Sequence, residues 1–378
     1  MVKPSGHWRF ESPIRYPLLF ILCLLVWSTS NADSFTLKTL PSTVSRLFPA
    51  GRGFDARYGA ANNSTIPDPD EVAARLNVQP YTRLPSWCWK YAWRGHGKML
   101  RILHWRDPAA AKDCDQSLKV VWLKALAAFN PKSPVHDPHR WTYDMLPSVA
   151  RWLILRLIPP RMYPRLHHAN IELRTTYLDK SIEKEIQSLS SANTKIRLIS
   201  LGAGYDVRSA RFLTDQQVDQ AFELDIPSVV DSKRIMLERL QRRRQRQHLN
   251  TTVLPVCRAV NLNDLPSVQT ALEEMCRQSH ESSTSTSEHE CWHTIFVSEG
   301  VLIYLDDTVP GKLLSLCAES IGKTGGTASL CLADRLENSP GGEAMPARQE
   351  LERAGWNVTD WCPKPGLARH MAVARLLV

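Results

Sequence analysis

The sequence predicts an α/β fold: a mostly parallel sheet with helices on both faces, preceded by an N-terminal helical cap. Three observations carry this prediction. A short apolar run at residues 196–201 enters a glycine-rich turn, Gly202-Ala203-Gly204, and a helical pattern follows. A second short run ends in Asp225 and is also followed by a helical pattern. Further strand patterns alternate with helical stretches, as is typical of parallel sheets.

The elements of the predicted sheet follow one another in a regular order. The expected strands are residues 196–201, 220–225, 252–259, 293–298 and 326–332, and the clearest helices between them are residues 207–213 and 228–248. In an open parallel sheet, ligands bind beyond the carboxyl ends of the strands. We therefore expect a ligand site where the first two strands end.

The segment 71–190 is helical in pattern and rich in tryptophan, and it is the predicted cap before a ligand-binding core at 191–378. Helices are expected at 117–129, which ends near Asn130-Pro131, and at 145–158, which ends before Pro159. Tryptophans among basic residues can stack on bases, but indoles packed between helices are the favoured interpretation. The seven tryptophans considered are Trp87, Trp89, Trp93, Trp105, Trp122, Trp141 and Trp152.

The first 70 residues have the composition of targeting segments. Basic residues precede an apolar run at 18–27, and small residues follow it, so residues 1–32 are a predicted signal peptide. Residues 33–70, poor in acids and rich in Ser, Thr and Arg at their start, are a predicted transit segment and linker. We expect a secretory or plastid location and no stable membrane span after cleavage. A cytoplasmic or membrane-anchored protein is the alternative.

The composition leaves the class of partner open. Lys and Arg total 47 against 38 Asp and Glu, a net charge of +9 that suits an anionic partner. Seven basic residues gather at 233–246, where a solvated helix face is favoured over a nucleic-acid contact. The nine cysteines lack the spacing of a zinc site, so no metal is expected.

The glycine turn and Asp225 together suggest a nucleoside cofactor. Glycines allow close approach to the backbone, and an acid that ends the second strand can accept hydrogen bonds from ribose hydroxyls. The third glycine of a dinucleotide fingerprint is missing, because Val207 stands there. A cofactor that has a ribose and no phosphate, such as S-adenosylmethionine, therefore fits better than a dinucleotide. A structural tight turn is the alternative.

Three motifs in order resemble the leucine carboxyl methyltransferase family: residues 198–208, LISLGAGYDVR; residues 222–227, FELDIP; and residues 298–305, SEGVLIYL. The similarity extends over about two thirds of the chain, from about Val135 to Trp356. Family members are class I methyltransferases with a Rossmann-like sheet, and they depend on S-adenosylmethionine. Some methylate the C-terminal leucine carboxylate of type 2A phosphatase catalytic subunits, others are O-methyltransferases, and one branch modifies tRNA.

The resemblance also implies which residues hold S-adenosylmethionine. Arg174 would bind the cofactor carboxylate, since a guanidinium can donate two parallel hydrogen bonds to it. Asn261 stands where the family usually has Asp, and its side-chain carbonyl can still accept from the adenine amino group. Lys124 is a weaker match, for which a surface position is the alternative. The full set of implied cofactor-binding residues is Arg174, Gly202, Gly204, Asp225, Asn261, Leu262 and Glu299.

The chemistry of methyl transfer assigns no catalytic residue from the sequence. The reaction is an in-line displacement, and a carboxylate acceptor is already ionised at pH 7, so positioning and desolvation can supply most of the rate. A hydroxyl acceptor would need a base, for which His136, His167 and His168 are candidates. Tyr304 either faces the substrate or packs.

The sequence therefore predicts an S-adenosylmethionine-dependent O-methyltransferase. Its acceptor is a carboxylate or another oxygen of a protein C-terminus or a small molecule, and nucleic acid is not favoured. Three alternatives stay open: a cofactor-binding protein that has lost transfer, a tRNA-modifying methyltransferase, and an oxidoreductase that would bind a nicotinamide dinucleotide.

Overall fold

The computed structural model describes residues 100–110, 112–130, 133–156, 165–189, 194–247, 252–281, 291–336, 344–362 and 370–377. All of them fall within one compact unit, Pro67–Val378. The predicted presequence, residues 1–70, and three of the seven tryptophans lie outside the described residues and stay predictions. Within the described ranges, no helix has the length and apolar character required to cross a membrane.

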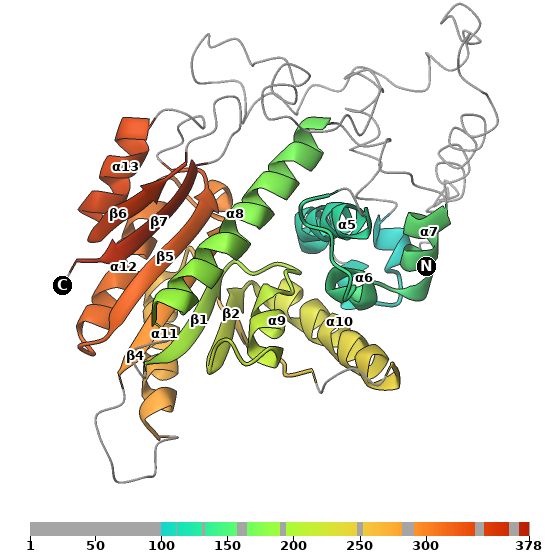
Figure 1. The fold of residues 1–378 in the computed structure, drawn as a ribbon, viewed down its shortest axis with the longest axis horizontal. Helices are drawn as coiled ribbons and strands as arrows, with labels where there is room; N and C mark the ends of the chain where they lie inside the picture. The colour runs from blue at the N-terminus through green and yellow to red at the C-terminus, as the bar shows by residue number, and fades with distance from the viewer. Residues whose placement is uncertain are drawn as a thin grey trace, which may run out of the picture. The chain divides into compact units, whose positions relative to one another are not determined.

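A seven-stranded sheet forms the centre of the described structure, in the order β3-β2-β1-β4-β5-β7-β6 (Figure 1). The first five strands are parallel, whereas β7 runs antiparallel to both β5 and β6. The strands are β1 Lys195–Leu201, β2 Gln220–Asp225, β3 Val256–Ala259, β4 Trp292–Glu299, β5 Thr327–Asp334, β6 Trp356–Trp361 and β7 His370–Leu376. The order reverses at β1 and β4, where doubly wound sheets bind their ligands.

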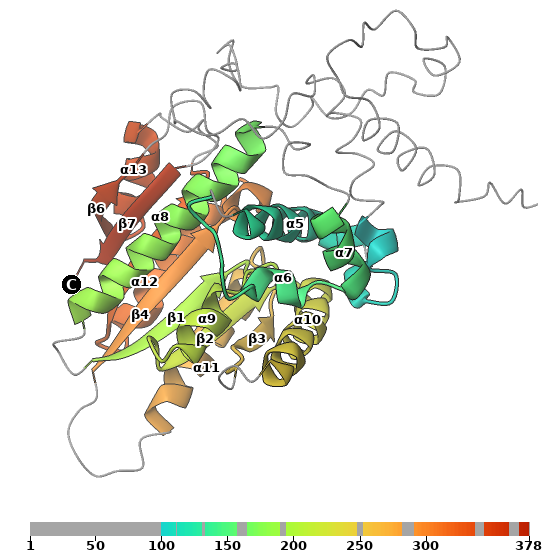
Figure 2. The same cartoon turned by 45° about the vertical axis from the view of Figure 1, so that its right-hand side comes forward.

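Helices cover both faces of this sheet, as predicted (Figures 1 and 2). Successive side chains of a strand point to opposite faces, so Ile199 joins a core with α11 and α12, whereas Leu198 joins a core with α8 and α9. The helices that flank the sheet are α8 Arg165–Leu189, α9 Arg208–Thr214, α10 Pro227–Arg246, α11 Leu265–Glu281, α12 Val309–Gly322 and α13 Ala344–Arg353. The predicted α/β class with a mostly parallel sheet is confirmed.

A group of short helices before α8 packs on α10 and on one part of α8 (Figure 2). They comprise η2 Pro108–Ala110, η3 Lys112–Cys114, α5 Asp115–Phe129, α6 Trp141–Met145 and α7 Ser148–Arg156. Their residues share a third core with α10. This is the expected helical cap, while the boundaries drawn at 71–190 and 191–378 stay predictions.

Several predicted boundaries need correction. The expected helix 145–158 was wrong at its start, because Met145 ends α6 and α7 begins at Ser148. Leu146 precedes Pro147 and is extended, with φ −70° and ψ 151°, as a residue before proline prefers. The third strand is shorter than expected because Pro255, which has no N–H to donate to a ladder, lies just before it. Strands β6 and β7 were not predicted.

The tryptophans of the cap divide into two groups. Trp122 and Trp141 are buried, as the packing interpretation requires. Trp105 and Trp152 are 68% and 51% exposed, so that interpretation is wrong for these two. The guanidinium of Arg244 on α10 lies 3.8 Å from the centre of the Trp141 ring, a cation–π contact that joins the cap to the core.

The basic stretch on α10 holds the cap through hydrogen bonds rather than forming only a solvated face. Arg239 donates to the Met145 carbonyl and pairs with Asp107 at 2.7 Å. Arg243 donates to the carbonyls of Asp144 and Leu146, each at 2.6 Å. These carbonyls lie around the break between α6 and α7, where helix ends leave backbone acceptors without intrahelical partners. The basic residues thus stabilise the cap where Pro147 interrupts it.

We predict that Arg243→Ala lowers the free energy of unfolding by about 1–3 kcal/mol, because two partly buried carbonyls lose their donor. The neighbouring exposed Arg242 is the matched control, and Arg242→Ala should change stability by less than about 0.5 kcal/mol. Chemical denaturation of the three proteins measures the difference. Equal stabilities would contradict the proposed role of the arginine in holding the cap.

Candidate functional site

The glycine turn after β1 is built for close approach to its backbone. Gly202 and Gly204 have φ of +60° and +50°, in the left-handed region that disfavours side chains. A Cβ atom on Gly202 would lie 2.1 Å from Cγ2 of Val301, so the turn and the segment after β4 are in direct contact. Both predicted glycines are therefore required by the conformation of the turn.

Asp225 closes this turn from the end of β2. Its Oδ2 accepts a hydrogen bond from the Gly204 N–H at 2.6 Å, and its Oδ1 accepts one from the Ile226 N–H at 2.8 Å. Burial raises the pKa of Asp225, although the two N–H groups and Lys233 act in the opposite direction. Each carboxylate oxygen has a second lone pair, so Asp225 can also accept from vicinal hydroxyls.

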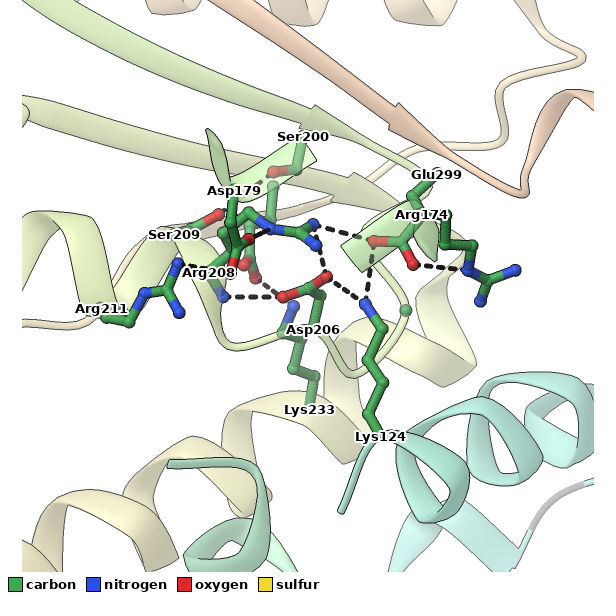
Figure 3. Close-up of polar contacts among 12 residues, drawn as sticks. Lys124, Arg174, Asp179, Ser200, Asp206, Arg208, Ser209, Arg211, Lys233 and Glu299 are labelled. Carbon is green, nitrogen blue, oxygen red and sulfur yellow. Dashed lines mark hydrogen bonds and ion pairs between the residues drawn. The ribbon is translucent and has the colours of Figure 1, made fainter. Parts of the chain in front are cut away.

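Six charged side chains meet beside the glycine turn, at the ends of β1 and β4 (Figure 3). Glu299 is the centre: its Oε2 lies 2.8 Å from Lys124 and 2.9 Å from Arg208, and its Oε1 lies 2.7 Å from Arg174. Asp206 pairs with Lys124 at 2.6 Å and with Arg208 at 2.7 Å. We call Lys124, Arg174, Asp179, Asp206, Arg208 and Glu299 the ion network.

The network is drawn from segments far apart in the chain. Lys124 lies on α5 of the cap, Arg174 and Asp179 lie on α8, and Glu299 ends β4. Arg208 begins α9 and pairs through its Nε with Asp179. Three cations and three carboxylates therefore converge, with no more than 21% of any of these side chains exposed.

The electrostatics of the network keep its acids ionised. Burial alone would raise the pKa of Glu299, but Lys124, Arg208 and Arg174 together lower it to about 2. Asp206 also has its pKa well below the ordinary value: burial opposes this shift, and Arg208 and Lys124 cause it. The pKa of Arg208 is raised well above its usual range despite burial, because Asp206, Asp179 and Glu299 surround it.

The arrangement fits the zwitterionic amino-acid group and the ribose of S-adenosylmethionine. Arg174 and Lys124 present cations suited to the carboxylate, and Glu299 and Asp206 present acceptors suited to the ammonium. The network offers both cations and carboxylates, so it can pair both charges of the amino-acid group and leave neither of them buried without a partner. The turn at Gly202 and the carboxylate of Asp225 lie next along the same sheet edge.

The adenine-side residues lie beyond Asp225. The Val260 N–H donates to the Asp225 carbonyl at 2.8 Å, which places Asn261 directly after this contact. Asn261 is exposed, and its Oδ1 accepts from the Asn263 N–H at 3.1 Å. Leu262 is 4% exposed and belongs to the core with α11 and α12. The structure therefore does not bring these two residues into the ion network.

Sequence reasoning missed half of the network. Asp206 and Arg208 lie within the matching run 198–208 but were given no role, and neither was Asp179. Their signal is the pair of opposite charges directly after the glycine turn, since a charge at a strand end in a ligand site needs a partner. Lys124, a weak match in the sequence, lies in the network with its Nζ between Asp206 and Glu299.

The structure assigns no catalytic role to the candidate bases or to Tyr304. His136 is exposed, with its Nδ1 2.8 Å from the Ala128 carbonyl oxygen. His167 and His168 lie on α8, but their side chains are outside the described residues. Tyr304 is 56% exposed on the short helix η5, Leu302–Tyr304, so it is not a core residue, and its role stays a prediction. Among the described residues, no group of metal-binding side chains occurs.

A separate groove of about 590 Å³ lies among α11, α12 and α13. It is lined by apolar residues such as Leu265 and Leu316 and by charged residues such as Lys312 and Glu350. None of the predicted cofactor-binding residues lines it. The ion network, where buried charges converge on a glycine turn, has the more specific chemistry of the two.

Comparisons with known proteins support the family resemblance. Residues 161–318 match the model of the family described as leucine carboxyl methyltransferase, so the resemblance found in the sequence is confirmed over this range. The matched range contains every predicted cofactor-binding residue and five of the six members of the ion network, all but Lys124. No curated protein sequence matches the chain.

The solved structures that match this chain have low sequence identity to it. Magnesium protoporphyrin IX methyltransferase from Synechocystis PCC 6803 with bound S-adenosylmethionine has 10% identity and a TM-score of 0.32, over 55% of this chain and 81% of that one. The riboflavin-derivative dimethyltransferase RosA from Streptomyces davawensis has 14% identity and a TM-score of 0.32, over 69% and 70% of the two chains.

We predict that Gly202→Ala destabilises the protein. The left-handed backbone costs about 1–2 kcal/mol for a residue with a Cβ, and the contact with Val301 adds about 1–3 kcal/mol. Gly322→Ala is the matched control, since a Cβ there meets no atom within 4 Å. Thermal unfolding should show a lower Tm for the first variant alone. Similar Tm values for both variants would contradict the close contact at Gly202.

We predict that Glu299 makes stability depend on pH in the acid range. Its pKa is depressed from 4.5 to about 2, so its contribution is present above pH 4.5 and is lost as the pH falls toward 2. This contribution is on the order of a few kcal/mol. The free energy of unfolding of the parent protein and of Glu299→Gln, measured from pH 7 to pH 3, should differ most near pH 7. A difference that is the same at every pH would refute this role.

Proposed function

We propose that this S-adenosylmethionine-dependent methyltransferase, which matches the leucine carboxyl methyltransferase family over residues 161–318, transfers a methyl group to an oxygen atom. The acceptor in this proposal is a carboxylate, or another oxygen, of a protein C-terminus or a small molecule. The single observation that supports it best is the ion network around Glu299, beside a glycine turn that Asp225 closes.

In this proposal the protein acts mainly by positioning. S-adenosylmethionine, when bound, supplies an electrophilic methyl group on a sulfonium. Arg174 and Lys124 hold its carboxylate, and Asp225 accepts from its ribose hydroxyls. An in-line displacement gains most from such fixed geometry and from the exclusion of water.

A carboxylate acceptor agrees with the family and with the chemistry. It is ionised at pH 7, so its oxygen can attack without first losing a proton to a protein base. Nucleic acid is not the proposed acceptor, because basic residues such as Arg239 and Arg243 on α10 bind carbonyls of the cap. The proposed acceptor is therefore small or peptidic.

Calorimetric titration with S-adenosylhomocysteine tests the cofactor site. We expect Arg174→Ala and Asp225→Ala each to weaken binding by about tenfold or more, since each removes a partner of a charged or hydrogen-bonding group of the ligand. Arg348→Ala, which changes an exposed arginine on α13, is the control and should bind like the parent. A folded parent protein that does not bind would sink the proposal.

The chemical class of the product tests the acceptor. Lysate or a library of small acids and peptides is incubated with protein and methyl-labelled S-adenosylmethionine, and the labelled product is then exposed to mild base. A methyl ester releases labelled methanol, whereas a methyl ether or a methylated nitrogen keeps its label. Base-stable label would overturn the carboxylate as acceptor while leaving the methyltransferase assignment in place.

A further inference from the structure

Asp334 ends β5 next to the end of β4 and is fully buried. Its neighbour Ala333 pairs with Glu299 in the register of the two parallel strands. Asp334 therefore lies one residue further along the chain than the residue that pairs with Glu299, the centre of the ion network. It was not among the predicted site residues.

A single oxygen of Asp334 organises the segment on both sides of Glu299. Its Oδ2 accepts hydrogen bonds from the Ser298 hydroxyl at 3.0 Å, from the Val301 N–H at 2.7 Å and from the Leu302 N–H at 3.0 Å. The other oxygen, Oδ1, accepts from the Arg335 N–H at 2.9 Å.

The backbone between these donors makes a sharp turn. Gly300 has φ of +65°, and its N–H donates to the Ala333 carbonyl at 3.1 Å. The turn folds residues 299–302 over the end of β5. Because Asp334 bonds to Ser298 before Glu299 and to Val301 after it, the carboxylate fixes the backbone on both sides of Glu299.

This fixed segment supplies two contacts of the candidate site. Glu299 reaches Lys124, Arg174 and Arg208, and Val301 lies against Gly202 where a Cβ would not fit. A shift of the segment by about 1 Å would lengthen the ion pairs of Glu299 and loosen the cover on the glycine turn, and losses of this kind are costly in binding sites.

We propose that Asp334 is a positioning residue for cofactor binding: it holds the segment 299–302 so that Glu299 and Val301 meet the ion network and the glycine turn. Asp334 acts through Glu299 and does not itself touch the cofactor. This inference rests on the proposed cofactor site.

The first test compares three variants in binding of S-adenosylhomocysteine. Asp334→Ala leaves buried N–H donors without an acceptor and should weaken binding about tenfold. Asp334→Asn keeps one carbonyl oxygen that can replace Oδ2, so it should restore most of the affinity. Ser329→Ala, on the same strand, removes a buried hydroxyl that bonds to His293 and is the control for lost stability alone. It should bind like the parent.

Two further readouts separate positioning from a merely structural role. Amide hydrogen exchange should accelerate at Val301 and Leu302 in Asp334→Ala, because these N–H groups lose their acceptor. In a double-mutant cycle with Glu299→Gln, the double variant should lose less binding free energy than the sum of the two single losses, because both changes disable the same contact. Ser298→Ala removes one donor only and should weaken binding less, which keeps the test open if Asp334→Ala does not fold.

The outcomes distinguish this inference from the proposed function. If the parent binds S-adenosylhomocysteine and a folded Asp334→Ala binds equally well, the positioning role is overturned and the cofactor site stands. Additive losses in the cycle would also overturn it. If the parent does not bind, the proposed function fails, and the positioning role fails with it.

Discussion

The neutralisation of Glu299 and Asp206 by three cations is the interaction on which the site depends. Buried carboxylates are costly unless each is paired and hydrogen-bonded, and these two are held by Lys124, Arg174 and Arg208. The cations come from α5, α8 and the start of α9. One electrostatic requirement therefore fixes the cap, the long helix and the carboxyl edge of the sheet to one another.

The backbone also shapes this edge of the sheet. The left-handed Gly202 admits Val301, and the left-handed Gly300 allows residues 299–302 to fold over the end of β5. Two carboxylates accept backbone N–H groups on either side: Asp225 from Gly204, and Asp334 from Val301. The site is thus formed by turns whose donors end on buried acids, which limits how far the charged side chains can move.

Local elements of this structure could be predicted from the sequence, whereas pairings between distant segments could not. Strand β2 was predicted at its observed ends, because an apolar run that stops at Asp225 is a local pattern. Strands β6 and β7 pair antiparallel at the sheet edge. Strand β7 also pairs with β5, which is not its neighbour in sequence. Likewise, the pairing of Arg208 with Asp179 and Glu299 spans distant segments. Residue type and spacing along the chain do not encode such partners.

The cap is part of the site and not only an addition to the core. Lys124 reaches the network from α5, while Arg239, Arg243 and Arg244 on α10 hold α6 and the residues around it. Helix α10 starts directly after Asp225 and Ile226, so the helix that anchors the cap begins where Asp225 closes the glycine turn. Loss of the cap would remove one of the three cations from Glu299 and leave a buried carboxylate short of a partner. Cap docking and the arrangement of the candidate site are therefore coupled through the same ion pairs.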